Sequence, residues 1–479
     1  GRRTAGTGGI GNRINRVWMD HGVWPYLTTG SYIERSADTG ILFKKCGYFR
    51  DHQLRRAQKL DPDFCQDDFI QRDRMNRPMA GTILEHILVQ NLVPFFNVGS
   101  HNIVRLENAD WNDGLDMAPD RGESVAFSCM YAHNLAGLCL LLERLKRNHP
   151  TITVMKELTL LIDTLHSPVA YDRYQEKQKR LSEYFDAIER PGGAPVSVPA
   201  DKLIADLQAK ACHMAQWIAR KEWLDCNFFN GYYDNRARRV EGIRGGRVTM
   251  LLASQVFAIM SGVASGAQVA KTWKSICRYL YDRPLGGFRL NTDMGNPAMD
   301  LGRAYGFSFG DKENGAFFSH MNVMLANALY SRSFVKEARL VMDSLYRMAC
   351  SERAGIPPVL PEYFNSQGKG LYLYLTGSAS WYIHTLVEQV LGISFSFGAI
   401  LLNPRLMPED FSGRIIRLES EFRAKQLVFI FSRPASGSGP FGIRRACVNR
   451  RILLPENGII RIPPSHITAS RNTISVELA

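Results

Sequence analysis

Apolar residues recur every three or four positions in long stretches between about Val17 and Val390, and this pattern most constrains the fold. Stretches between them are rich in Gly, Pro, Asn and Asp, which favour loops, and several also carry aromatic residues. Long helices joined by long polar loops indicate an α-helical barrel with its functional site at the loop ends. The helical stretches are 81–96, 126–147, 199–223, 248–262, 267–281, 319–349 and 377–392.

The pattern changes after about Ser394. Short, β-branched and often alternating segments follow, and they are separated by Gly, Pro and Asn. Such segments predict an all-β module of roughly 80 residues. The chain is therefore predicted to be mainly α with a β C-terminal module, and the boundary divides it into residues 1–395 and 396–479.

Composition excludes several classes of protein. The formal net charge is +13 over 479 residues, but no long basic run accompanies it, so nucleic-acid binding is not expected. The nine cysteines form no CxxC pair and are odd in number, which favours reduced thiols in a cytoplasmic protein over disulfides or a metal site. The apolar stretch 135–145 is too short to span a membrane and is interpreted as a buried helix. The motif GTGGIG (6–11) lacks the preceding strand that a nucleotide site requires.

The stretch NADWNDGLDMAPDRGES (108–124) gathers five carboxylates around Trp111. A calcium loop counted from Asp110 would need glycine at its sixth position and glutamate at its twelfth, where Leu115 and Arg121 stand. A catalytic acid fits better, because an indole can stack on a pyranose ring and raise the pKa of a neighbouring carboxyl by desolvating it. The alternative is structural: Asp113 caps a helix or turn.

Three ordered motifs resemble one enzyme family. WNDG (111–114) after RLENAD, KENGAFFSH (312–320) and YLTGSASWY (374–382) are similar to segments of the inverting β-glucoside phosphorylases of glycoside hydrolase family 94. RVWMDHGVWPYLT (16–28) resembles the early barrel of the cellodextrin-type members. The resemblance implies an (α/α)6 barrel, incomplete at its N-terminal side, followed by a small β-sandwich or jelly-roll domain.

The resemblance also implies a role for each matching residue. Asp113 corresponds to the general acid that protonates the glycosidic oxygen. Trp111 and Lys312 correspond to residues that bind the transferred glucosyl unit. The phosphate ligands correspond to His320, Thr376 and Gly377. Without the resemblance, His320 could be a core histidine, Thr376 an N-cap and Lys312 part of a surface turn.

The implied reaction is reversible phosphorolysis of β-linked gluco-oligosaccharides with inversion, which yields α-glucose 1-phosphate. Inorganic phosphate is the co-substrate, no metal or other cofactor is expected, and neither a membrane nor a nucleic acid is a partner. The resemblance implies a homodimer, and it leaves the linkage and chain length of the substrate open.

Two alternatives remain. An inverting β-glucan hydrolase would use Glu313 or Asp116 as the base that activates water.

The second alternative concerns the extent of the chain. The family's opening barrel region, which supplies further phosphate and sugar ligands, has no counterpart here. The chain is therefore expected to be a fragment of a longer protein or an inactive remnant that retains only sugar binding.

Overall fold

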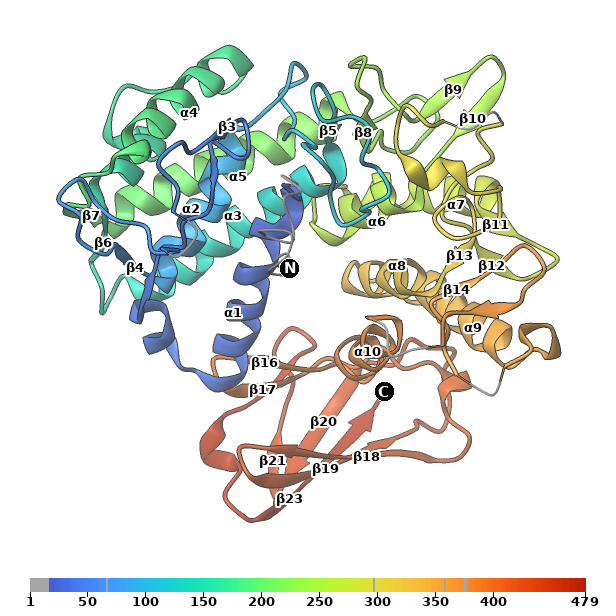
Figure 1. The fold of residues 1–479 in the computed structure, drawn as a ribbon. Helices are drawn as coiled ribbons and strands as arrows, with labels where there is room; N and C mark the ends of the chain where they lie inside the picture. The colour runs from blue at the N-terminus through green and yellow to red at the C-terminus, as the bar shows by residue number, and fades with distance from the viewer. Residues whose placement is uncertain (1–16, 66–67, 296–297, 357–358, 374–376) are drawn as a thin grey trace, which may run out of the picture. The chain divides into compact units, whose positions relative to one another are not determined.

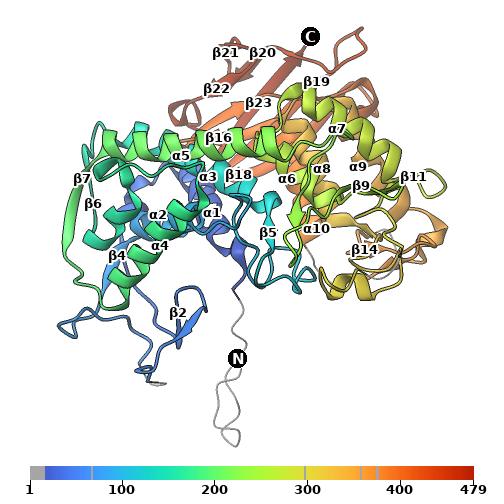
Figure 2. The ribbon, with the colours of Figure 1, turned by 90° about the horizontal axis from the view of Figure 1, so that it is seen from above.

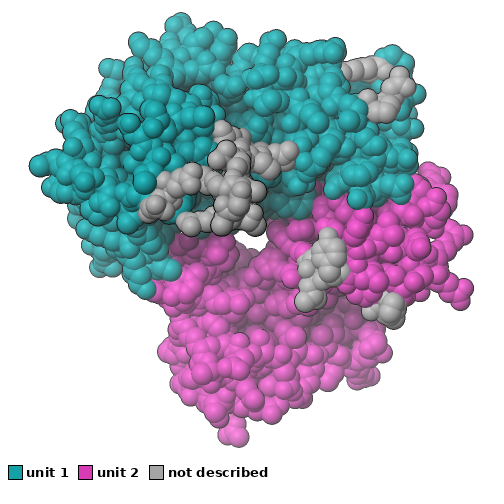
Figure 3. Space-filling model, in the orientation of Figure 1, with its two compact units in different colours: residues 1–27, 40–280, 289–316 teal, residues 28–39, 281–288, 317–479 magenta. Residues whose placement is uncertain are grey.

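The computed structural model describes residues 17–65, 68–295, 298–356, 359–373 and 377–479 (Figure 1). The chain divides into two compact units, which Figure 3 shows in different colours. The first unit contains residues 1–27, 40–280 and 289–316, and the second contains 28–39, 281–288 and 317–479. The motif at residues 6–11 and Thr376 lie outside the described residues.

Every predicted helical stretch contains a helix. The stretch 319–349 contains two, because the chain turns between them at Ser333, whose φ is +65°. Two helices were not predicted: α1, and the polar α4, whose apolar side is narrow. The described helices are α1 (Val23–Ser36), α2 (Ile83–Phe96), α3 (Val125–Leu145), α4 (Tyr174–Glu189), α5 (Ala200–Lys221), α6 (Leu252–Met260), α7 (Gly266–Tyr279), α8 (Ser319–Ser331), α9 (Val335–Ala349) and α10 (Gly377–His384).

The long helix α3 forms the centre of the first unit and runs beside α5 (Figures 1 and 2). Ser124 caps its N-terminus by accepting a hydrogen bond from the Phe127 backbone N–H at 3.2 Å. Among the described helices of 18 residues or more, α3 alone has the length and composition to cross a membrane, contrary to the sequence-based expectation. Its apolar window is 72% buried inside the protein, as for the core helix of a soluble protein.

A buried ion pair joins α5 to the neighbouring 3-10 turn Asp163–Leu165, and a second one lies within α5. The Lys210 ammonium is fully buried and donates to Asp206 Oδ2 at 2.6 Å and to Asp163 Oδ1. These contacts compensate for the loss of hydration that a buried ammonium suffers.

Short two-stranded ladders hold the loops of the first unit. They are β1 (Lys45–Gly47) with β4 (Ala80–Thr82), β2 (Gln53–Leu54) with β3 (Lys59–Leu60), β5 (Glu123–Ser124) with β8 (Tyr232–Tyr233), β6 (Thr151–Met155) with β7 (Pro195–Pro199), and β9 (Gly242–Arg244) with β10 (Arg247–Thr249). The β5–β8 ladder leads from the acidic stretch into α3 and thereby fixes the end of that stretch.

In the second unit, short strands again hold the loops near its helices. The ladder β11 (Tyr281–Asp282) with β12 (Gly287–Phe288) is two-stranded, and β13 (Phe317–Phe318), β14 (Tyr363–Phe364) and β15 (Gly370–Leu371) form a three-stranded sheet. The last helix, α10, continues into a π-helical turn at Thr385–Val390.

The β-rich C-terminal region is confirmed. Its three-stranded sheet has the order β16–β17–β22 and its five-stranded sheet the order β18–β19–β23–β20–β21, in which only β19 and β23 are parallel. The sequence analysis missed β16 and β20. The strands are β16 (Ile393–Ser396), β17 (Ala399–Leu402), β18 (Ile415–Phe422), β19 (Lys425–Ser432), β20 (Ile443–Val448), β21 (Arg451–Leu453), β22 (Ile460–Ile462) and β23 (Arg471–Leu478).

Contacts within the second unit tie these strands to distant parts of the sequence. The backbone N–H groups of Phe397 and Gly398 donate to Glu34 of α1, to Oε2 at 3.0 Å and to the carbonyl at 2.7 Å. The C-terminal strands therefore share one compact unit with α8, α9, α10 and the end of α1. The sandwich form and a domain boundary at 395–396 stay predictions.

Candidate active site

Trp111 and Asp113 lie on one turn of the first unit. The Trp111 indole is half-buried and meets the ring of Phe257 on α6 edge to face, with ring centroids 6.4 Å apart. The turn is closed by the Asn112 side chain, whose Oδ1 accepts from the Gly114 backbone N–H at 3.2 Å. This packing and this hydrogen bond hold the two residues in one local structure.

Asp113 faces solvent and a guanidinium. Its side chain is 57% exposed, and Arg303 Nη2 donates to its Oδ2 at 3.0 Å. The sequence analysis expected Trp111 to desolvate this carboxyl, and the exposure shows that it does not. Sequence reasoning also missed Arg303, because its segment LGRAYG carries no recognisable motif.

Arg303 also binds Asp116. Its Nη1 donates to Asp116 Oδ2 at 2.8 Å and its backbone N–H to Oδ1 at 3.1 Å, and the Asp116 side chain is only 5% exposed. Both carboxylate oxygens are therefore occupied by the same arginine. This arrangement does not suit a base that must activate water.

A close backbone approach brings Arg303 to this place. A Cβ on Gly302 would lie 2.0 Å from the Gly114 carbonyl oxygen, so only glycine fits there. The Ala304 backbone N–H donates to the same carbonyl at 3.1 Å. The loop that carries Arg303 thus lies directly on the WNDG turn.

Lys312 belongs to the same unit as Trp111 and Asp113. It lies in the turn that the Asp311–Asn314 bridge closes, with φ of +47°, and its Nζ sits 4.8 Å from the centroid of the Phe307 ring. The cation–π contact ties the ammonium to the loop that also carries Arg303. A residue with positive φ outside glycine is uncommon and is compatible with a functional turn.

His320 and Gly377 meet in the second unit. His320 is the second residue of α8 and Gly377 the first of α10. A Cβ on Gly377 would lie 2.4 Å from His320 Cε1 and 2.7 Å from Nδ1, so the imidazole rests directly on the glycine. Two helix N-termini, which attract anions, therefore converge at this imidazole.

Aromatic rings surround this imidazole. The rings of Phe318 and Trp381 lie with centroids 5.9 Å from that of His320. Burial lowers the pKa of His320 to about 4. The imidazole is consequently neutral near pH 7 and can serve an anion only as a hydrogen-bond donor.

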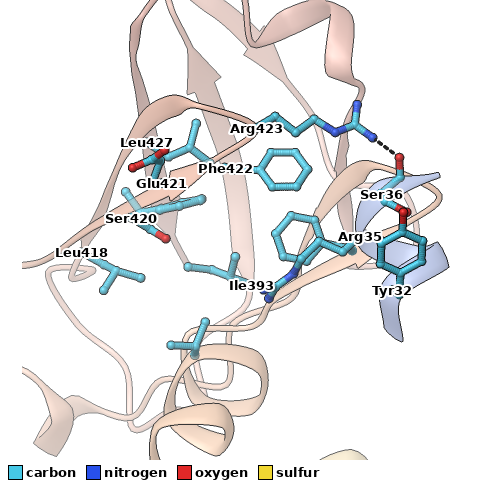
Figure 4. A pocket seen from close by; sticks show the side chains of 13 residues that line it. Tyr32, Arg35, Ser36, Ile393, Leu418, Ser420, Glu421, Phe422, Arg423 and Leu427 are labelled. Atoms are coloured by element: carbon cyan, nitrogen blue, oxygen red, sulfur yellow. Dashed lines mark hydrogen bonds between the residues drawn. The ribbon is translucent and has the colours of Figure 1, made fainter. Parts of the chain in front are cut away.

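A further cavity of about 420 Å³ lies in the second unit (Figure 4). Its walls contain apolar side chains of β16, β18 and β19, among them Ile393, Phe395 and Leu418, and polar or charged side chains such as Arg35 and Glu421. Arg423 at its edge donates to the Ser36 carbonyl at 2.6 Å. None of the predicted site residues lines it, and among the described residues no three His, Cys, Asp or Glu side chains are grouped to hold a metal ion.

Comparison with known proteins relates part of the chain to one enzyme family. Residues 200–349 match the catalytic domain of the glycosyl hydrolase 94 superfamily. The chain is similar to the solabiose phosphorylase of Paenibacillus borealis, with 21% identity over 82% of this chain and 42% of that protein. It is also similar to the cellobionic acid phosphorylase of Neurospora crassa, with 25% identity over 40% of this chain and 25% of that protein.

The chain spans less than half the length of either relative. Both relatives are named as phosphorylases. Among solved structures, a sialidase matches with 10% identity and a TM-score of 0.42 over 80% of this chain and 31% of that chain. A D-mannose isomerase matches with 10% identity and a TM-score of 0.30 over 59% and 56% of the two chains. These scores are too low to define the fold.

Proposed function

We propose that this protein phosphorolyses β-linked gluco-oligosaccharides of the cellodextrin type with inversion and releases α-glucose 1-phosphate. The observation that carries the proposal is the contact between His320 and Gly377 at two helix N-termini. The neutral imidazole N–H and the backbone N–H groups of these N-termini are donors that suit a phosphate oxyanion, which has to remain nucleophilic. The phosphorylase relatives support the same class of reaction.

In the proposed mechanism Asp113 gives a proton to the glycosidic oxygen while phosphate attacks the anomeric carbon from the opposite face. Trp111 forms the wall of the glucosyl subsite, Lys312 binds sugar hydroxyls, and His320, Thr376 and Gly377 bind phosphate. To reach the glycosidic oxygen, Asp113 exchanges its contact with Arg303 for one with the sugar. One carboxyl suffices, because phosphate replaces the water that an inverting hydrolase must activate with a second one.

A hydrolase is the competing proposal, and it is the weaker one. Of its two candidate bases, Asp116 is buried and bound twice by Arg303.

We also propose that the helices complete an (α/α)6 barrel and that the C-terminal strands form a sandwich. The protein is proposed to be a cytoplasmic homodimer.

The decisive experiment uses the protein in the longest form that its gene encodes. It is incubated with β-1,2-, β-1,3- and β-1,4-linked gluco-oligosaccharides, with solabiose and with cellobionic acid, each with and without inorganic phosphate. We expect glucose 1-phosphate to appear only with phosphate and only from the correct linkage. Release of free glucose without phosphate would establish the hydrolase instead, and binding without either product would establish a non-catalytic sugar-binding protein.

A further inference from the structure

Two buried carboxyls lie beneath the turn that carries Trp111 and Asp113. Asp110 is fully buried and Asp20 is 3% exposed. A buried carboxylate loses its hydration, so each needs partners or a proton. Asp113, three residues after Asp110, shares neither the burial nor this requirement, since its side chain is 57% exposed.

Asp110 connects the turn to the start of α3. Its Oδ1 accepts from the Asn112 backbone N–H at 2.9 Å, and its Oδ2 accepts from Ser124 Oγ at 2.8 Å. Ser124 is the residue that caps α3. One carboxyl therefore ties the backbone between Trp111 and Asp113 to the N-terminus of the long helix α3.

Asp20 approaches Asp110 through a backbone contact. The Met19 N–H donates to the Ala109 carbonyl at 2.9 Å, which sets the 3-10 turn Met19–Gly22 against the residue before Asp110. Asp20 Oδ2 accepts from Trp24 Nε1 at 2.7 Å, whereas its buried Oδ1 has no hydrogen-bond partner among the described residues.

We propose that Asp110, buried close to Asp20, is a positioning residue whose single retained proton keeps the Trp111–Asp113 turn in place for the reaction. The inference rests on the proposed function only in assigning chemistry to Asp113. Loss of that proton puts two negative charges into one buried site. Their repulsion is relieved when the turn moves away from Asp20.

The surrounding groups support proton retention. Burial, followed by the charge of Asp20, raises the pKa of Asp110 to about 7, and burial also raises the pKa of Asp20. Hydrogen bonds act in the opposite direction and lower both pKa values: those of Ser124, Tyr232 and Asn112 act on Asp110, and that of Trp24, followed by the charge of His21, acts on Asp20. The other titratable or charged groups around the pair are Tyr131 on α3, Tyr232 on β8, Glu241 beyond Tyr232, and the Arg56–Glu107 ion pair near Tyr131.

The test follows the Trp111 turn without any substrate. The seven tryptophans are replaced by 5-fluorotryptophan, and the Trp111 fluorine resonance is assigned with Trp111→Phe. In the parent protein we expect this resonance to shift with a midpoint near pH 7. In Asp110→Asn the shift should be absent, and in Asp20→Asn the midpoint should move to lower pH because the neighbouring charge is gone.

Asp120→Asn is the matched control, because this exposed carboxyl lies on the same stretch and does not contact Asp110 through a described hydrogen bond. In Asp120→Asn the Trp111 resonance should shift with the same midpoint as in the parent protein. A parent resonance that does not titrate between about pH 6 and pH 8, or an unchanged midpoint in Asp20→Asn, would overturn the proposal. Asp20→Asn keeps the test valid if Asp110→Asn does not fold.

An activity measurement separates this inference from the proposed function. On the substrate found in the panel, Asp110→Ala, which removes the contacts with Asn112 and Ser124, should lower kcat by about 100-fold with little change in KM, as misplacement of a reacting group does. Asp110→Asn, which imitates the protonated carboxyl, should keep kcat near the parental value and should not lose activity above pH 7. A parent whose Trp111 turn titrates but which forms no glucose 1-phosphate refutes the proposed function alone. A parent that forms glucose 1-phosphate but whose Trp111 turn does not titrate refutes the positioning role alone.

Discussion

At the scale of single residues, two aspartates three positions apart occupy opposite environments. Asp110 is fully buried and holds the turn, whereas Asp113 is exposed and contacts Arg303. A proton donor needs access to the substrate, so exposure is compatible with the role proposed for Asp113. Substitution of Asp113 should consequently remove its chemical role without disturbing the packing of the core.

Replacement of Asp113 by Asn should abolish phosphorolysis and leave the fold intact. Loss of a positioned general acid costs about 10²–10⁴ in rate, and an exposed ion pair contributes only about 0–1 kcal/mol to the free energy of unfolding. Glucose 1-phosphate release and thermal unfolding followed by circular dichroism measure the two quantities. Asp120→Asn should keep both parental values, and an Asp113→Asn variant with near-parental turnover would refute the assignment.

The buried imidazole of His320 makes stability depend on pH. Its pKa is about 4 in the folded protein, whereas an ordinary histidine has a pKa of 6.5, so between these values the unfolded chain binds the extra proton. The folded state therefore loses up to about 3 kcal/mol as the pH falls from 6.5 to 4. Denaturant unfolding at several pH values should show that the free energy of unfolding falls less in His320→Asn than in the parent protein. His384→Asn, whose side chain is 45% exposed, should change the loss much less, and an equal effect of both variants would contradict the argument.

At the scale of elements, the first residue of α10 and that of α7 are both glycines in different surroundings. A Cβ on Gly377 meets the His320 ring, whereas a Cβ on Gly266 meets no atom within 4 Å. Gly377→Ala should therefore lower the free energy of unfolding by about 1–3 kcal/mol through overpacking and should raise KM for phosphate.

Gly266→Ala is the matched control for this prediction. It should be neutral or slightly stabilising, because alanine restricts the unfolded chain more than glycine does. Chemical denaturation measures both variants, and phosphate saturation at fixed sugar concentration gives KM. Equal behaviour of the two alanine variants would show that the His320 contact has no energetic weight.

At the scale of the whole molecule, the C-terminal strands depend on residues far away in the sequence. A fragment of residues 396–479 lacks most of β16, the edge strand of the three-stranded sheet, and lacks Glu34, which binds Phe397 and Gly398. Unpaired backbone groups and exposed apolar strands should leave this fragment without a cooperative transition. Thermal unfolding followed by circular dichroism tests this, and a sharp transition would confirm an independent domain at that boundary.

The sequence by itself determined the helices with wide apolar faces and most of the C-terminal strands, because those periodicities are local properties of the chain. It missed α4, whose apolar side is narrow, and β20, whose charged residues hid a strand. Local pattern and family resemblance together also indicated Trp111 and Asp113 as one site.

Only the tertiary structure decided the surroundings of each carboxyl. Arg303 lies 190 positions from Asp113, and Asp20 lies 90 positions before Asp110, so no local pattern could associate them. Burial and charge depend on which distant segments fold against a residue, and those contacts settled that Asp110 is buried, Asp113 exposed and Asp116 occupied. The apposition of His320 and Gly377 has the same origin, since two helices must pack before their N-termini can meet.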